Sequence, residues 1–152
     1  MSHKILVLHG PNLNLLGKRE PEIYGSETLD QINEVLTNIA SKNQILIDIF
    51  QSNSESHLIE KVHGSFQEGV NFLVINPGGL THTSVALRDA ISAIRIPFIE
   101  VHMSNIYSRE SFRRKSFFSD LSIGVVCGFG SFGYEMAMEF ATKKLRDASW
   151  WI

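Results

Sequence analysis

The feature that most constrains the fold of this chain is the alternation of short apolar runs with segments of helical periodicity. The apolar runs are typical of buried strands and lie at 4–9, 45–50, 72–75, 97–101 and 122–127. Helical patterns lie at 29–41, at 54–66, from 81–84 to 94, and at 134–147. Apolar strands that alternate with helices indicate a parallel sheet covered on both faces. We therefore expect an α/β fold of the flavodoxin-like, doubly wound type, with a five-stranded parallel sheet and helices on both faces.

The length and charge of the chain fit one soluble domain. A chain of 152 residues matches a single domain with one core, so 1–152 is expected to be one domain. The 14 basic and 16 acidic side chains leave a net charge of −2. This balance gives no broad electrostatic surface for nucleic acid or for an anionic membrane, although a local site for a small anion remains compatible with it.

Cysteine content and hydropathy bear on the compartment. Cys127 is the only cysteine, so no intrachain disulfide forms, and its apolar run 123–128 predicts a buried structural thiol. The first residues do not resemble a signal peptide. No window approaches the roughly 20 apolar residues that a membrane helix needs. We expect a reducing, cytoplasmic setting.

Polar side chains occur where the predicted strands end, and ligands of open parallel sheets bind beyond these carboxyl ends. Asn12 follows the first strand, and Asn76 follows the third. Glu100 and His102 stand at the end of the fourth strand, on one face, because side chains alternate along a strand. A carboxylate in that place can fix the tautomer of the imidazole.

Neighbouring segments add further polar groups. His82 is expected at the start of the third helix, and Asp89, seven residues later, is expected two turns along the same face. The loops after the first and fourth strands contain Arg19, Tyr24, Arg109, Arg113 and Arg114. Amide, imidazole, carboxylate, guanidinium and phenol groups at one rim are typical of a site for a polar, hydroxyl-rich anion.

Each of these residues also has a simpler structural interpretation. Asn12 and Asn76 fit ordinary turns. His82 and Asp89 fit the exposed surface of a helix, and the basic run 109–115 fits a solvated loop. The carboxylate and imidazole on the fourth strand can form a plain ion pair. The joint placement of these groups at one rim favours the functional interpretation.

Phosphate-loop and metal motifs give no competing site. The segment 128–133 matches G-x-G-x-x-G and follows a strand, but no βαβ unit comes after it and no acidic residue stands in register. We interpret it as a turn for close helix–sheet packing or anion contact. The histidines show no metal-ligand spacing, and His9, His57 and His63 are expected to be structural, so no metal site is expected.

Three segments resemble the signature of the type II 3-dehydroquinate dehydratases. They are 9–25, which begins His-Gly-Pro-Asn-Leu-Asn, 76–90, which begins Asn-Pro-Gly-Gly-Leu-Thr-His, and 99–105. The resemblance spans essentially the whole chain and implies the same flavodoxin-like fold. It also implies anti elimination of water from 3-dehydroquinate to 3-dehydroshikimate through an enol or enolate, with no cofactor. The reaction serves the shikimate pathway, and with it chorismate and aromatic amino acid biosynthesis, or the quinate pathway.

The resemblance further implies a role for each residue of the rim. Tyr24 is the base, acting as tyrosinate, and Arg19 is the cation that stabilises the tyrosinate. Asn12 holds a water or contacts the enolate oxygen directly, as an oxyanion donor. His102, oriented by Glu100, is the general acid. The implied substrate contacts are Asn76, His82, Asp89, Arg113 and the backbone at Met103 and Ser104.

The segment from Gly17 to Gly25, which contains the implied base, is expected to be a lid that closes over the substrate. The resemblance also implies a homo-oligomer, a dodecamer built as four trimers. Apolar residues of 117–118 and 150–152 can serve either the core or an interface.

The chain departs from the family pattern after the fourth strand. Arg114 and Lys115 stand where the family usually has a histidine pair, and Phe117 replaces a tyrosine. Gly79 stands where alanine is common. Arg113 still aligns, so the departures bear on loop packing or subunit contacts.

Two binding modules share the predicted topology and are the alternatives. An FMN-binding module needs a phosphate loop rich in Ser, Thr and Gly after the first strand, where this chain has 10–16, Gly-Pro-Asn-Leu-Asn-Leu-Leu. A phosphorelay receiver needs acidic residues after the first strand and an Asp and a Lys at the third and fifth strand ends. This chain has Asn12, Asn76 and Gly128 there.

Overall fold

A computed structural model of the chain describes residues 2–18 and 20–150, with the backbone alone for Tyr24. It contains one sheet with the strand order β2-β1-β3-β4-β5, and every pair is parallel. The strands are β1 (Lys4–His9), β2 (Leu46–Gln51), β3 (Phe72–Asn76), β4 (Phe98–His102) and β5 (Gly124–Cys127). The helices are α1 (Pro21–Tyr24), α2 (Leu29–Lys42), α3 (Glu55–Gln67), α4 (Val85–Ile94) and α5 (Phe132–Arg146). The predicted five-stranded, doubly wound sheet is confirmed.

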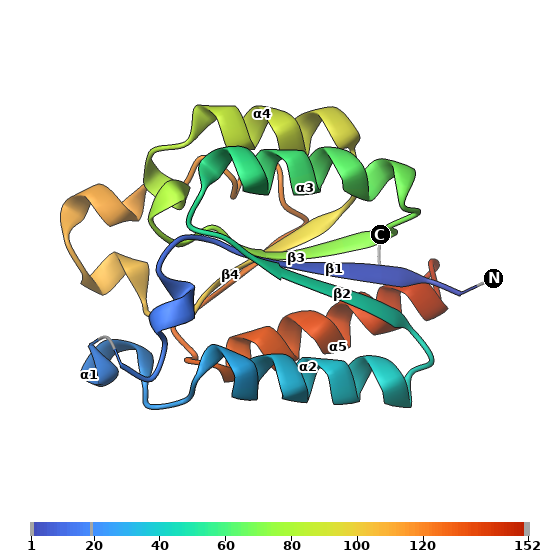
Figure 1. Cartoon of the computed structure of the whole chain (residues 1–152), viewed down its shortest axis with the longest axis horizontal. Helices are drawn as coiled ribbons and strands as arrows, with labels where there is room; N and C mark the ends of the chain where they lie inside the picture. Colours follow the sequence, from blue (N-terminus) through green and yellow to red (C-terminus); the bar gives the residue numbers. More distant parts are fainter. Residues whose placement is uncertain (1, 19, 151–152) are drawn as a thin grey trace.

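The helices cover both faces of the sheet. Helices α2 and α5 pack on one face, and α3 and α4 pack on the other (Figure 1). The side chains of β1 alternate between the two layers. Ile5 and Val7 belong to the core beneath α2 and α5, whereas Leu6 and Leu8 belong to the core beneath α3 and α4. No helix in residues 2–18 and 20–150 is long and apolar enough to cross a membrane.

Side-chain caps define where the main helices begin. The side chain of Thr28 accepts a hydrogen bond from the backbone N–H of Gln31, and the backbone N–H of Thr28 donates to the side chain of Gln31, which completes a capping box for α2. Ser54 caps α3, and Ser84 caps α4 by accepting from the backbone N–H of Leu87. These caps stand where the sequence predicts helix starts.

The structure corrects the predicted start of the third helix. Ser84 is the N-cap of α4 and has an extended backbone, so the helix cannot include His82. His82 instead ends a short 3-10 helix, η2 (Gly78–His82). The expectation that His82 and Asp89 share one helix face was therefore wrong.

Other boundaries also differ from the prediction. The strand β5 begins at Gly124 and not at 122, because the backbone N–H of Ser122 is bonded to Phe118 within the preceding turn. Residues 21–24 form the short helix α1, which begins at a proline, within a segment predicted to be a loop. Three further 3-10 helices occur: η1 (Leu13–Leu15), η3 (Ile106–Ser108) and η4 (Ser111–Arg114), the last two within the predicted loop 104–120.

The turns after β1 and β3 touch backbone to backbone. The N–H of Gly10 donates to the carbonyl oxygen of Asn76 at 2.8 Å. A Cβ on Gly10 would lie 2.2 Å from the carbonyl oxygen of Pro77, and one on Gly78 would lie 2.9 Å from that of Pro11. Both glycines are therefore needed for this contact, and the contact brings the segments that carry Asn12 and Asn76 side by side.

We predict that Gly10→Ala destabilises the fold by more than about 2 kcal/mol, because the new methyl group meets rigid backbone. The matched control is Gly79→Ala, since a Cβ at Gly79 meets nothing within 4 Å. This control is expected to melt at or slightly above the wild-type temperature, because alanine restricts the unfolded chain. Thermal unfolding followed by circular dichroism measures both. Equal melting temperatures for the two variants would contradict the close contact at Gly10.

Candidate active site

A cavity of about 170 Å³ lies beyond the carboxyl ends of β1, β3 and β4. Its walls come from the turns after these strands and from the segment with η3 and η4. The structure therefore brings most of the predicted site residues together. Those that line the cavity are Asn12, Asn76, His82, His102, Met103, Ser104 and Arg113.

Asn12 presents its side chain from a left-handed turn. Its φ is 69°, a conformation that asparagine tolerates better than most residues. Its backbone N–H donates to Oδ1 of Asn53 at 2.9 Å, and the Asn53 side chain in turn accepts from Gln51. Asn53, which the sequence analysis did not single out, holds this turn in place from the segment after β2.

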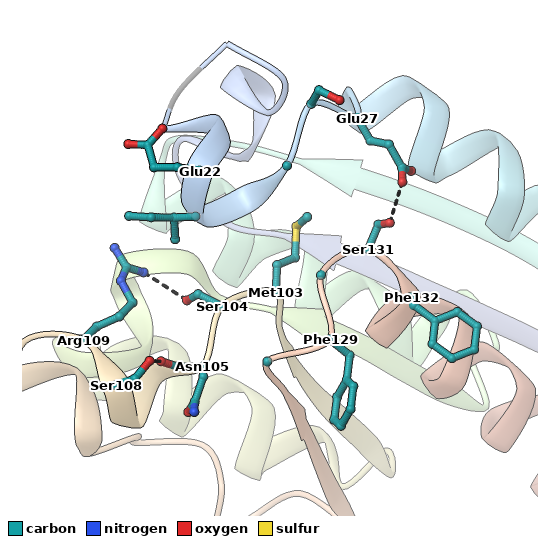
Figure 2. Close-up of a pocket in the computed structure, with 15 residues that line it drawn as sticks. Glu22, Glu27, Met103, Ser104, Asn105, Ser108, Arg109, Phe129, Ser131 and Phe132 are labelled. Atoms are coloured by element: carbon teal, nitrogen blue, oxygen red, sulfur yellow. Dashed lines mark hydrogen bonds between the residues drawn. The ribbon is translucent and has the colours of Figure 1, made fainter.

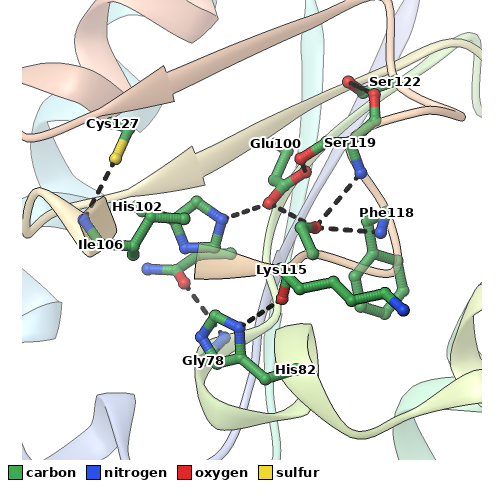
Figure 3. A network of polar contacts seen from close by, with 12 residues as sticks. Gly78, His82, Glu100, His102, Ile106, Lys115, Phe118, Ser119, Ser122 and Cys127 are labelled. Atoms are coloured by element: carbon green, nitrogen blue, oxygen red, sulfur yellow. Dashed lines mark hydrogen bonds and ion pairs between the residues drawn. The ribbon is translucent and has the colours of Figure 1, made fainter. Parts of the chain in front are cut away.

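His102 and Glu100 form a buried pair at the end of β4 (Figure 3). Nε2 of His102 donates to Oε2 of Glu100, so Nδ1 is the ring nitrogen that a ligand in the cavity can reach. The predicted pairing of the carboxylate with the imidazole is confirmed. The residues share one strand face, as their spacing of two requires.

Two serines complete the surroundings of Glu100 (Figure 3). Ser116 Oγ donates to one carboxylate oxygen at 2.9 Å, and Ser119 Oγ donates to the other at 2.7 Å. Burial alone would raise the pKa of Glu100, but the hydrogen bond and charge of His102 and the two hydroxyls outweigh it and lower the pKa. Glu100 is thus an anion with three donors, and neither serine was predicted from the sequence.

His82 is held by backbone and not by a side chain. Its Nδ1 donates to the carbonyl oxygen of Lys115 at 2.8 Å, which leaves Nε2 as the acceptor toward the cavity (Figure 3). Burial lowers the pKa of His82, and the positive charge of Arg113 adds to this effect. His82 is therefore neutral at pH 7 and can accept a hydrogen bond from a hydroxyl group.

Two guanidinium groups border the cavity. Arg113 lines it and donates from Nε to Oε1 of Glu110 at 3.2 Å. Arg109 also lines it and donates to Ser104 Oγ at 3.1 Å. From the sequence, Arg109 is predicted only to lie in the loop after the fourth strand, because nothing in a run of basic residues indicates which side chain points toward the site.

Four predicted residues do not appear in the cavity lining, and one of them is Glu100, which is bonded to His102 from the strand. Asp89 is exposed on α4 and does not line it. Arg19 lies outside the described residues, and so does the side chain of Tyr24. The predictions for Arg19 and Tyr24 therefore stay predictions.

A larger open cavity of about 790 Å³ adjoins the first and shares Met103, Ser104 and Arg109 with it (Figure 2). One wall is the α1 segment with Glu22 and Ile23. The helix α1 therefore stands beside the candidate site.

The opposite wall of the larger cavity is the glycine-rich turn after β5. The N–H groups of Gly128 and Gly130 donate to the carbonyl oxygens of His102 and Met103, so this turn packs against the end of β4. Such contacts support the packing interpretation of the G-x-G-x-x-G segment. Cys127 is half-buried, where a buried thiol was expected, and its Sγ donates to the carbonyl oxygen of Ser104.

The remaining histidines differ in their surroundings. His9 is fully buried, whereas His57 and His63 are exposed on α3. Within residues 2–18 and 20–150, no group of three or more His, Cys, Asp or Glu side chains is arranged to hold a metal ion.

The departures in the loop after β4 act through backbone and packing. Lys115 contributes its carbonyl oxygen to His82, while its ammonium group lies 5.5 Å from the centre of the Phe117 ring. The carbonyl oxygen of Phe117 accepts from Arg88 at 2.7 Å, and its ring packs half-buried against the core that contains Phe118. Neither the Lys115 nor the Phe117 side chain lines the cavity. Trp150 packs on Phe140, and residues 151–152 lie outside the described part.

Comparisons with known proteins agree with this geometry. The family model described as Dehydroquinase class II matches residues 3–142. A 3-dehydroquinate dehydratase of Nitrosomonas europaea is 55% identical over 144 residues, which cover 95% of this chain and 100% of that protein. One of Laribacter hongkongensis is 56% identical over 142 residues, which cover 93% of this chain and 92% of that protein. The crystal structure of type II dehydroquinase from Butyrivibrio crossotus superposes with a TM-score of 0.89 at 40% identity and covers 91% of this chain and 97% of that one.

We predict that Ser119→Ala raises the pKa of Glu100, because it removes a donor to the buried carboxylate. The folded carboxyl has the lower pKa, so its contribution to stability is present above the ordinary pKa of 4.5 and is lost as the pH falls through the folded value. The variant should lose about 1.5 kcal/mol at neutral pH and less at an acidic pH at which the folded carboxyl is protonated.

Urea unfolding at the two pH values measures this difference. Ser122→Ala is the matched control, because its hydroxyl donates at 2.8 Å to the neutral carbonyl oxygen of Ser119. The stability lost by Ser122→Ala should not depend on pH. An equal loss for Ser119→Ala at both pH values would mean that this serine does not act on the charge of Glu100.

Proposed function

We propose how this chain, which belongs to the class II dehydroquinase family, removes water from 3-dehydroquinate. The activity is that of a hydro-lyase, and the product is 3-dehydroshikimate, an intermediate of the shikimate pathway. The observation that carries the residue assignments is the convergence of Asn12, Asn76, His82 and His102 on one polar cavity. The relatives described above are dehydratases, which leaves the FMN-binding and receiver alternatives without support.

The reaction begins with removal of a proton from the carbon next to the ketone, and we assign this step to Tyr24. A free phenol has a pKa near 10, so the phenolate needs a nearby cation. Arg19, five residues earlier, is permanently charged and supplies it. Tyr24 is the last residue of helix α1, and this helix borders the larger cavity through Glu22 and Ile23. This position supports a base that enters from that side when the segment 17–25 closes.

The enolate that results needs a hydrogen-bond donor at its oxygen. Asn12 suits this role, because its turn is held by Asn53 and its side chain borders the cavity. A donor that is already in place stabilises developing charge without reorganisation.

The leaving hydroxyl group needs a proton, and His102 supplies it from Nδ1. Nε2 of the same ring donates to Glu100, whose negative charge stabilises the protonated imidazole before the transfer. When the carbon–oxygen bond breaks, its electron pair takes the proton from Nδ1 and water departs. The imidazole left behind is neutral.

The remaining groups hold the substrate. The neutral His82 accepts from a hydroxyl group, and Asn76 can donate and accept at once. Arg113, together with the backbone N–H groups of Met103 and Ser104, suits the carboxylate and hydroxyl oxygens. We add Arg109 to this set, because it lines both cavities.

Asp89 requires a different explanation. Its exposed position on α4 does not suit a contact within its own cavity. A homo-oligomer resolves this, because an exposed carboxylate can reach the cavity of a neighbouring copy. The proposed assembly is a dodecamer of four trimers, and the proposed compartment is the cytoplasm, which cell fractionation tests.

We expect wild-type protein to convert 3-dehydroquinate to a product that absorbs in the ultraviolet as a conjugated enone, with no cofactor added. Tyr24→Phe should reduce kcat by a factor on the order of 10³ or more, because the base is removed, while substrate still binds. Tyr107→Phe is the matched control, since Tyr107 is exposed and lines neither cavity. Near-normal turnover by Tyr24→Phe would refute the base assignment.

We expect Asp89→Ala and Tyr24→Phe to complement each other in mixed oligomers. If Asp89 enters a neighbour's site, a mixed assembly contains some sites with both native side chains, and activity returns when the two variants are produced together. Analytical ultracentrifugation measures the size of the assembly. A monomer in solution, or no recovery in confirmed mixed oligomers, would contradict the proposed role of Asp89.

A further inference from the structure

A buried chain of hydrogen bonds runs from helix α2 through the core to the substrate cavity. It links Asn33 on α2, His9 at the end of β1, Tyr134 on α5 and Asn76 at the end of β3. Tyr134 and His9 are fully buried, and neither lines the cavity. Of these four hydrogen-bonded residues, Asn76 alone lines the cavity.

The direction of every bond follows from the backbone next to Asn76. The N–H of Gly78 can only donate, and it lies 3.1 Å from the side chain of Asn76, so the atom that faces it is the acceptor Oδ1. The other end of the amide is therefore Nδ2, which donates to the hydroxyl oxygen of Tyr134 at 2.8 Å.

The hydroxyl of Tyr134 then donates its hydrogen bond to His9. Tyr134 Oη lies 3.0 Å from Nδ1 of His9, which must accept, and Nε2 of His9 donates to Oδ1 of Asn33 at 2.8 Å. With this assignment every donor in the series faces an acceptor, and only the second N–H of Asn76 is left for a ligand in the cavity. Burial keeps the side chains of His9 and Tyr134 neutral, because it lowers the pKa of His9 to about 4 and raises the pKa of Tyr134.

We propose that Tyr134 and His9 are positioning residues for the dehydration, because their hydrogen-bond chain fixes which edge of the Asn76 amide the substrate meets. This rests on the proposed role of Asn76 as a substrate contact. Nδ1 of His9 accepts the hydrogen bond from the hydroxyl of Tyr134, so the Tyr134 oxygen faces Asn76 with lone pairs only. Asn76 keeps one N–H and one lone pair for the substrate, in fixed places.

Loss of the tyrosyl oxygen would leave Nδ2 against an apolar ring. A buried donor without a partner is unfavourable, so the amide would rotate toward the cavity and misplace its free N–H. Contacts made in both the ground state and the transition state act on KM more than on kcat. The effect of Tyr134→Phe on catalysis should therefore depend on the presence of the Asn76 side chain.

The test is a double-mutant cycle of Tyr134→Phe and Asn76→Ala, with kcat and KM measured on 3-dehydroquinate. Tyr134→Phe should lower kcat/KM roughly tenfold, mainly through KM, which is the size expected for one misplaced hydrogen bond. On the Asn76→Ala background, Tyr134→Phe should change kcat/KM by less than about twofold. Ser65→Ala removes another buried hydroxyl, on α3 and outside the cavity, and controls for lost stability alone.

The outcomes separate this proposal from the proposed function. If Asn76→Ala keeps normal kcat/KM, then Asn76 is no substrate contact, and both ideas fail at that residue. If Asn76→Ala is impaired but folded Tyr134→Phe is normal, or if the two losses add, the positioning role alone is overturned. If Tyr134→Phe does not fold, the same cycle with His9→Phe decides by the same criteria, because Tyr134 then loses its acceptor and turns its proton toward Asn76.

Discussion

The backbone of the turn after β1 lies against the backbone of the turn after β3, and the site depends on this contact. With no side chain at Gly10, its N–H reaches the carbonyl oxygen of Asn76, and Pro77 packs where a Cβ would stand. Strands β1 and β3 are neighbours in the centre of the sheet, so their carboxyl ends meet. Asn12, the proposed enolate donor, and Asn76, the proposed substrate contact, are thereby placed in the lining of one cavity of about 170 Å³. A small polar cavity of this kind suits a hydroxylated cyclic acid better than an extended cofactor.

The polar groups around this cavity are held by a second layer of partners that do not line it. Glu100 holds His102 and is itself held by Ser116 and Ser119. A buried carboxylate without such donors would favour protonation and would not stabilise a charged imidazole. Because one ring nitrogen of His102 or His82 is hydrogen-bonded to the protein, the other ring nitrogen of the same side chain is the one available to the substrate. Electrostatic stabilisation is effective because these dipoles are oriented before the substrate arrives.

The side of the site to which we assign proton abstraction differs from this hydrogen-bonded wall. The segment of α1 borders an open cavity of about 790 Å³ that shares Met103, Ser104 and Arg109 with the smaller one. In the proposed mechanism the acid, His102, belongs to β4 of the sheet, whereas the base, Tyr24, belongs to the separate segment 17–25. Such a division permits the substrate to enter before water is excluded.

The sequence by itself determined the sheet, its helical layers and the rim at which the chemistry lies, because periodicity and strand–helix alternation are local properties of the chain. It also determined the pairing of Glu100 with His102, since two residues of one strand that are two apart must share a face. Only the tertiary structure decided that His82 belongs to a 3-10 helix and that Asp89 is exposed and does not line the cavity. The same is true of the partners Asn53, Ser119 and Tyr134, which come from distant segments. No local pattern records such contacts, because they arise only when separate elements pack together.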